Sequence, residues 1–105
     1  MPGAHPMTDE SKLEQDVTKA LRAQELLESE LLTEAFTGLE DSYVAAWRAT
    51  GIEDISAREK LFLAINIVGK VRDHLTAIVT SGKLAQAELK ELAQLAERRK
   101  RFGIA

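Results

Sequence analysis

The stretch Leu61-Phe-Leu-Ala-Ile-Asn-Ile-Val68 decides the fold of this 105-residue chain. Its apolar side chains cover nearly the whole circumference of a helix, and a helix that is hydrophobic all round is expected to be buried all round. A chain of this length supplies too few neighbouring helices to surround it, so we expect a second copy to cover part of it. Asn66 interrupts the run, and two interpretations stay open: a buried Asn that fixes the register of an oligomer, or an Asn on the one exposed edge.

The residues around this run predict an all-α fold. Ala, Leu, Glu, Lys, Gln and Arg favour helix, and both prolines lie in the first six residues. Ser56-Ala-Arg-Glu59 has the pattern of a capping box and predicts a helix over about 57–81. We expect Ser81-Gly82 to end that helix and Lys83 to open a C-terminal one.

The N-terminal half carries two helical stripes of different phase. Apolar residues repeat in steps of three and four after Thr8-Asp9, and from Leu32 the repeat changes phase. This shift predicts a break near Ser29, with helices over about 9–28 and 29–50. The alternative, one helix that shows different faces to different neighbours, stays open.

A short loop follows the second of these helices. Thr50-Gly51 is expected to end the helix, with Gly51 in the left-handed cap conformation. Because the loop 51–55 is short, the next helix should run antiparallel to the one before. The sequence therefore predicts a long antiparallel helical hairpin with flanking N- and C-terminal helices, assembling into an oligomer.

Three aromatic residues share one face of the helix over 29–50, and we expect them to pack on Phe62 and its neighbours. The alternative is a hot spot for a partner protein. The full set of expected core and oligomer-interface residues is Phe36, Tyr43, Trp47, Leu61, Phe62, Ile65, Val68 and Leu75.

The predicted organisation has three parts. Residues 1–8 form a disordered tail, because they hold both prolines and no periodic pattern. Residues 9–82 form the oligomerisation hairpin with its N-terminal helix, and residues 83–105 form a C-terminal helix with a basic tail.

The sequence offers little for catalysis, so we expect no enzyme, no cofactor and no metal. There is no cysteine, which excludes thiol chemistry. His74 has no carboxylate at three or four residues' distance, and no metal-binding or phosphate-loop pattern occurs. No apolar run approaches the roughly 20 residues of a membrane span, and no signal peptide begins the chain. We expect a soluble, cytoplasmic protein without a membrane partner.

The charges are unevenly spread, and one basic run stands out. Residues 1–50 carry ten acidic and four basic residues, whereas residues 51–105 carry seven acidic and ten basic ones. The residues expected to bind nucleic acid or a partner are Arg98, Arg99, Lys100, Arg101 and Phe102. Four consecutive cations favour phosphate binding through counterion release, and they equally suit a helix C-terminus. A phosphate-tracking tail and a protein-docking tail both stay open, without sequence-specific DNA reading.

Several stretches together resemble a known group of proteins. They are Ala35-Phe-Thr-Gly-Leu-Glu-Asp-Ser-Tyr-Val-Ala-Ala-Trp-Arg48, Ala57-Arg-Glu-Lys-Leu-Phe-Leu-Ala64, Gly69-Lys-Val-Arg-Asp-His-Leu75 and Ser81-Gly-Lys-Leu-Ala85. Over roughly residues 26–102 the chain resembles small helical proteins encoded by tailed phages, prophages and gene transfer agents of proteobacteria. Some of these lie in the DNA-packaging region and look like small terminase subunits.

The resemblance implies a function. Small terminases assemble into rings through a long helical hairpin, present viral DNA to the large terminase and regulate it without catalysis. Here residues 29–81 would supply the hairpin and residues 83–105 the segment that contacts DNA or the large terminase. Residues 1–28 are too short and too acidic for the helix-turn-helix domain of many small terminases, which implies weak, non-specific DNA contact or a purely adaptor role. The alternative is a structural or chaperone-like phage bundle that binds a capsid or tail protein.

Overall fold

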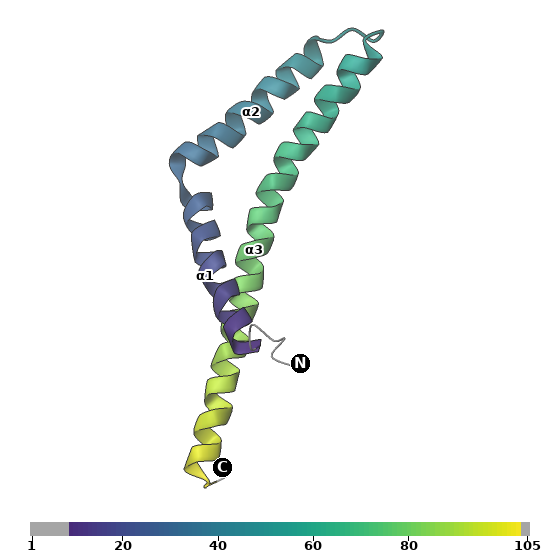
Figure 1. The fold of residues 1–105 in the computed structure, drawn as a ribbon. Helices are drawn as coiled ribbons and strands as arrows, with labels where there is room; N and C mark the ends of the chain where they lie inside the picture. The colour runs from purple at the N-terminus through teal and green to yellow at the C-terminus, as the bar shows by residue number, and fades with distance from the viewer. Residues whose placement is uncertain (1–8, 104–105) are drawn as a thin grey trace. The chain divides into compact units, whose positions relative to one another are not determined.

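The computed structural model describes residues 9–103, and within that range the chain forms three helices and no strand (Figure 1). The helices are α1 (Asp9–Glu28), α2 (Glu30–Ala49) and α3 (Ile55–Arg101). The prediction of an all-α fold is therefore confirmed. The expected tail over residues 1–8 falls outside the described range.

The predicted break at Ser29 is confirmed. Ser29 has extended backbone angles, φ −67° and ψ 119°, and serves as the N-cap of α2. Its side-chain oxygen accepts a hydrogen bond from the Leu32 N–H at 3.3 Å, which satisfies one of the free donors at the start of the helix. Residues 9–50 thus form two helices.

The end of α2 differs from the prediction for Gly51. Thr50 leaves the helix in an extended conformation, and both its N–H and its hydroxyl donate to the Trp47 carbonyl, at 3.2 and 2.6 Å. Gly51 is not left-handed; among the described glycines, Gly103 has the positive φ. Because Thr50 already satisfies the helix end, no left-handed residue is needed. The Gly51 N–H donates instead to the Asp54 carboxylate, at 3.1 Å.

The predicted capping box at Ser56 is wrong, because α3 begins earlier, at Ile55. The Arg58 N–H already bonds to the Asp54 carbonyl at 2.9 Å. Ser56 and Glu59 consequently lie inside the first turns of the helix. The loop closed by Asp54 and Gly51 starts the helix before the Ser56 hydroxyl can act as its cap.

The predicted helix end at Ser81-Gly82 is also wrong, since α3 continues through it to Arg101. The reason is an unbroken alternation of three- and four-residue steps in which Gly82 occupies one position. We call these positions the α3 seam: Leu61, Ala64, Val68, Val71, Leu75, Ile78, Gly82, Ala85, Leu89, Leu92 and Ala96.

The chain divides into two compact units, each described by itself. Among the described residues, one consists of residues 9–23 and 77–103 and the other of residues 24–76. In the first, α1 approaches α3 so closely that a Cβ atom on Gly82 would overlap the Ala20 side chain. Small residues make this approach feasible: Ala20, Ala23 and Ala85 are buried.

In the unit of residues 24–76, α2 and residues 55–76 of α3 contact each other in antiparallel order. Thr50, after the end of α2, contacts Arg58 near the start of α3, and Glu40, earlier in the chain, contacts Arg72, further along α3. Val68 is the buried hydrophobic residue of this unit. Across residues 9–103, no helix combines the length and the apolar character that a membrane crossing requires.

Candidate functional site

Two arginines of α3 make the principal polar contacts with α2. The Arg58 guanidinium lies 4.8 Å from the centroid of the Trp47 ring and donates to the Thr50 hydroxyl at 2.9 Å. The Arg72 guanidinium lies 5.2 Å from the centroid of the Phe36 ring, and its Nη1 is 3.2 Å from Glu40 Oε1. Each arginine thus combines a cation–π contact with a polar contact.

These arginines were missed by sequence reasoning, although a signal for them exists. Arg58 stands three residues before Leu61, and Arg72 four residues after Val68. This spacing brings both onto the face that carries the seam residues. At such a position a long arginine stem can lie over the apolar face while its guanidinium reaches the edge.

The expected core residues of α2 and α3 divide into two groups. Phe36, Tyr43 and Trp47 are half-buried, as are Leu61, Ile65 and Leu75, and Val68 is buried. Phe62, which was expected to pack against the three aromatic residues of α2, is 59% exposed. The Trp47 and Phe36 rings contact the guanidinium groups of Arg58 and Arg72 instead. Phe62 follows Leu61 directly, so it projects about 100° away from the seam.

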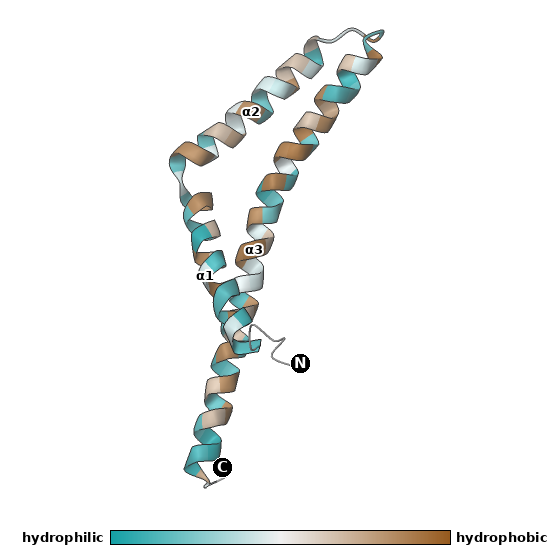
Figure 2. Cartoon of the chain, viewed as in Figure 1, coloured by the Kyte–Doolittle hydropathy of each residue, from teal (hydrophilic) through white to brown (hydrophobic). Residues whose placement is uncertain are grey.

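Large hydrophobic side chains remain exposed on both α2 and α3, and Figure 2 shows hydrophobic residues recurring along α3. On α2, Leu31 is 77% exposed. The exposed large residues on residues 30–76 are Leu31, Leu39, Ile52, Ile55, Phe62, Leu63, Ile67 and Val71. Within residues 30–76, these exposed residues outnumber the fully buried hydrophobic one, Val68.

Asn66 is exposed in the single chain. Its side-chain Nδ2 donates to the Phe62 carbonyl, one turn earlier, at 2.8 Å. The single chain therefore matches the exposed-edge interpretation, and a role in fixing oligomer register stays a prediction.

The basic run forms the last turn of α3. Arg98, Arg99, Lys100 and Arg101 are all exposed, and Phe102, just beyond the helix, is 68% exposed. A shallow surface depression is lined by Gln94, Glu97, Arg98 and Arg101, all from the same helix. Four cations displayed around one helix end can approach a phosphate backbone or an acidic protein from several directions.

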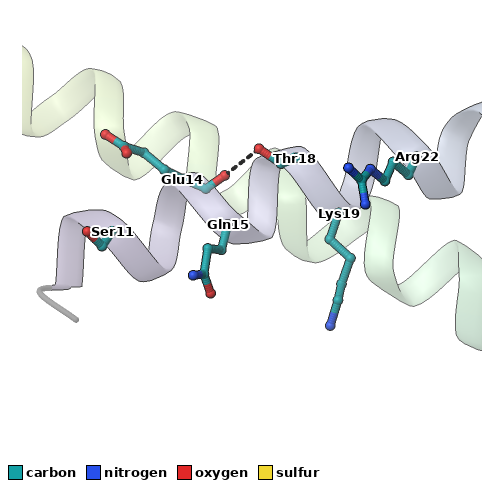
Figure 3. Close-up of a pocket in the computed structure, with 6 residues that line it drawn as sticks. All are labelled: Ser11, Glu14, Gln15, Thr18, Lys19 and Arg22. Carbon is teal, nitrogen blue, oxygen red and sulfur yellow. Dashed lines mark hydrogen bonds between the residues drawn. The ribbon is translucent and has the colours of Figure 1, made fainter. Parts of the chain in front are cut away.

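A second depression lies on α1. Figure 3 shows the residues that line it: Ser11, Glu14, Gln15, Thr18, Lys19 and Arg22. The Thr18 hydroxyl donates to the Glu14 carbonyl at 3.0 Å, a bond within the helix. Because one helix supplies the entire lining, the depression is the polar outer face of α1, with no second element enclosing it.

The histidine and the carboxylates of the described residues form no metal-binding cluster. His74 is exposed and lines a small apolar depression with Ile67, Lys70 and Val71. Within residues 9–103, no group of three or more His, Asp or Glu residues has the geometry to hold a metal ion. The surfaces with a distinct character are therefore the exposed apolar faces of residues 30–76 and the basic end of α3.

Comparison with known proteins gives no further assignment: no family model, curated protein or solved structure matches this chain.

Proposed function

We propose that this chain is a non-enzymatic adaptor that works as a homo-oligomer, in the manner of the small terminase subunits it resembles. Its helical hairpin, formed by α2 and the first half of α3, would assemble the oligomer. The basic end of α3 would make weak, non-specific contact with DNA or recruit a large terminase. The same proposal includes a cytoplasmic location, in a host cell if the chain is viral.

The observation that carries the proposal is the imbalance between buried and exposed apolar side chains. Among the described residues, the buried hydrophobic ones are Val68 and three alanines, Ala20, Ala23 and Ala85. Burial of a large aliphatic or aromatic side chain stabilises a fold by about 1.5–3 kcal/mol, and alanine contributes far less. Many large apolar side chains are thus left exposed in the single chain, and self-assembly would bury them.

The basic end of α3 supports the second half of the proposal. The four cations are exposed, and within residues 9–103 none of them forms an ion pair with a carboxylate. Such a cluster attracts a polyanion by releasing its condensed counterions.

A DNA-binding measurement tests this half. Duplex DNA of unrelated sequences should bind with similar affinity, and the affinity should fall as salt rises. Replacing Arg98, Arg99, Lys100 and Arg101 with Gln should flatten the plot of log affinity against log salt by about 0.9 per lost phosphate contact. The matched control is Lys12→Gln with Lys19→Gln, which removes cations from α1 and should leave the slope unchanged. An unchanged slope in the basic-end variant would remove DNA from the proposal.

The second candidate function is a structural or chaperone-like bundle that binds a capsid or tail protein. The 68% exposure of Phe102 favours it, since large aromatic side chains serve as anchors in protein-binding interfaces. Under this function, the Gln variant of the basic run would keep its protein partner, whereas Phe102→Ala would lose it.

A further inference from the structure

Two outward faces of the unit formed by residues 24–76 are complementary to each other. The first lies on α3, where Leu63, Ile67 and Val71 follow one another at four-residue steps and therefore share one side of the helix. These side chains are 58%, 59% and 47% exposed. We call this side the α3 outer face; Val71 lies at its border with the α3 seam and is the least exposed of the three.

The charged residues beside the α3 outer face are mainly basic, and Glu59, four residues before Leu63, is the acidic one at this spacing. Lys60, Lys70 and His74 lie three or four residues from its apolar members and are exposed. Ile67, Lys70, Val71 and His74 together line a surface depression with a largely apolar wall. The face thus consists of large apolar side chains, with the two lysines as its main charged neighbours.

The second face lies on α2 and has the opposite character. Leu31, Ala35 and Leu39 are spaced by four residues, and Gly38 lies beside them. A Cβ atom on Gly38 would meet nothing within 4 Å, so the backbone is open to a neighbour there. Glu34 and Asp41, both exposed, flank these residues. We call this side the α2 outer face.

We propose that the α3 outer face of one copy of this chain docks on the α2 outer face of a second copy. Large side chains from α3 would fit over the small residues of α2, and Lys60 and Lys70 would approach Glu34 and Asp41. Contacts between like faces are disfavoured by charge repulsion. Two α3 outer faces would bring lysines together, and two α2 outer faces would bring carboxylates together. The contact is therefore head-to-tail, with a different surface contributed by each copy.

This inference rests on the proposed self-assembly and names its interface. The occupant is a second copy because both halves of the complementary pair are present on one chain. Residues 55–76 hold four basic and two acidic residues, whereas α2 holds four acidic and one basic. Arg58 and Arg72 already contact α2 within the chain, at Trp47 and Glu40, which leaves Lys60 and Lys70 for a neighbour.

The first arm of the test removes the apolar contact. Ile67→Glu should raise the apparent dissociation constant of self-association by at least about thirtyfold, the scale of an interface hot spot. The matched control is Leu84→Glu on the same helix, where the side chain is 68% exposed and lies outside both faces. Both variants should keep the helical circular dichroism of the parent, because both side chains are exposed.

The second arm reverses the charges. Lys60→Glu with Lys70→Glu should weaken assembly, and so should Glu34→Lys with Asp41→Lys. All four changes together should restore it, since the charges are complementary again. Analytical ultracentrifugation of the full chain at low salt measures each mass.

The outcomes separate this interface from the proposed function. A parent chain that is monomeric overturns both. A parent chain that assembles while Ile67→Glu leaves its mass unchanged, or while the fourfold reversal fails to restore assembly, overturns the interface alone.

Discussion

Gly82 of α3 lies against Ala20 of α1 with no room for a side chain of its own. A Cβ atom added there would overlap the Ala20 side chain and stand 3.2 Å from the Asp16 carbonyl oxygen. Gly69, on the same helix, has nothing within 4 Å of an added Cβ. Gly82 is therefore required by the close contact with α1, whereas no neighbouring atom restricts the side chain at position 69.

This contrast gives a stability prediction. Gly82→Ala should destabilise the chain, because overpacking costs about 1–3 kcal/mol and outweighs the ~1 kcal/mol gained in helix propensity. Gly69→Ala should stabilise it by up to about 1 kcal/mol, since only the propensity term applies. Urea unfolding followed by circular dichroism measures both. Equal effects of the two substitutions would contradict the close approach of α1 to α3.

Ser29 carries a second residue-scale prediction. Ser29→Ala removes the side-chain acceptor for the Leu32 N–H and should cost about 1 kcal/mol of stability. Ser56→Ala is the control, because Ser56 lies inside α3 and alanine favours a helix interior. Thermal unfolding of the two variants distinguishes them. A larger loss at Ser56 than at Ser29 would restore the capping box that the sequence pattern suggests.

Residues at chain turns show what the sequence could and could not predict. The break at Ser29 could be predicted because the periodic pattern of apolar residues shifts there and a serine, a good N-cap residue, stands at the shift. The predictions of a left-handed Gly51 and of a capping box at Ser56 were wrong, because neighbouring residues end α2 and start α3 in another way. Thr50 satisfies the end of α2 without a left-handed residue, and Asp54 starts α3 before Ser56 is reached. Which residue caps a helix thus depends on hydrogen bonds made by neighbouring residues, and these lie outside the motif itself.

At the scale of elements, α3 is one helix of 47 residues. The Ser-Gly pair at 81–82 is a typical helix end in sequence, yet the seam passes through it in step. The unbroken seam spacing from Leu61 to Ala96 predicts one continuous helix. A rule that ends a helix at every Ser-Gly pair does not take this spacing into account. A buried glycine at a seam position indicates a close helix contact as readily as a helix end.

The last turns of α3 differ from the rest of the helix. Residues 91–101 are all exposed, including the seam positions Leu92 and Ala96, whereas Gly82 and Ala85 are buried. Backbone amides in an unpacked helix open locally at little free-energy cost. Native-state hydrogen exchange should therefore show faster exchange for residues 91–101 than for residues 78–89 of the same compact unit. Equal protection along α3 would mean that these last turns are covered by another chain.

At the scale of the whole molecule, the described chain buries few of its apolar side chains. The sequence predicted this shortage from the run at 61–68 and from the length of the chain. It could not predict which side chains stay outside, because that depends on the rotation of α3 against α2. Arg58 and Arg72 occupy the contact with α2, and Phe62 lies outside it. The shortage of buried area is what makes a second copy the expected neighbour.

Absolute mass in solution tests this central claim most directly. Light scattering behind a sizing column, at low and high salt, should give a mass of several subunits, because exposed apolar faces associate and salt weakens only their charged rims. The oligomer should persist at high salt, with the head-to-tail contact weakened. A mass of one chain, 11.6 kDa, at every salt and protein concentration would contradict the account.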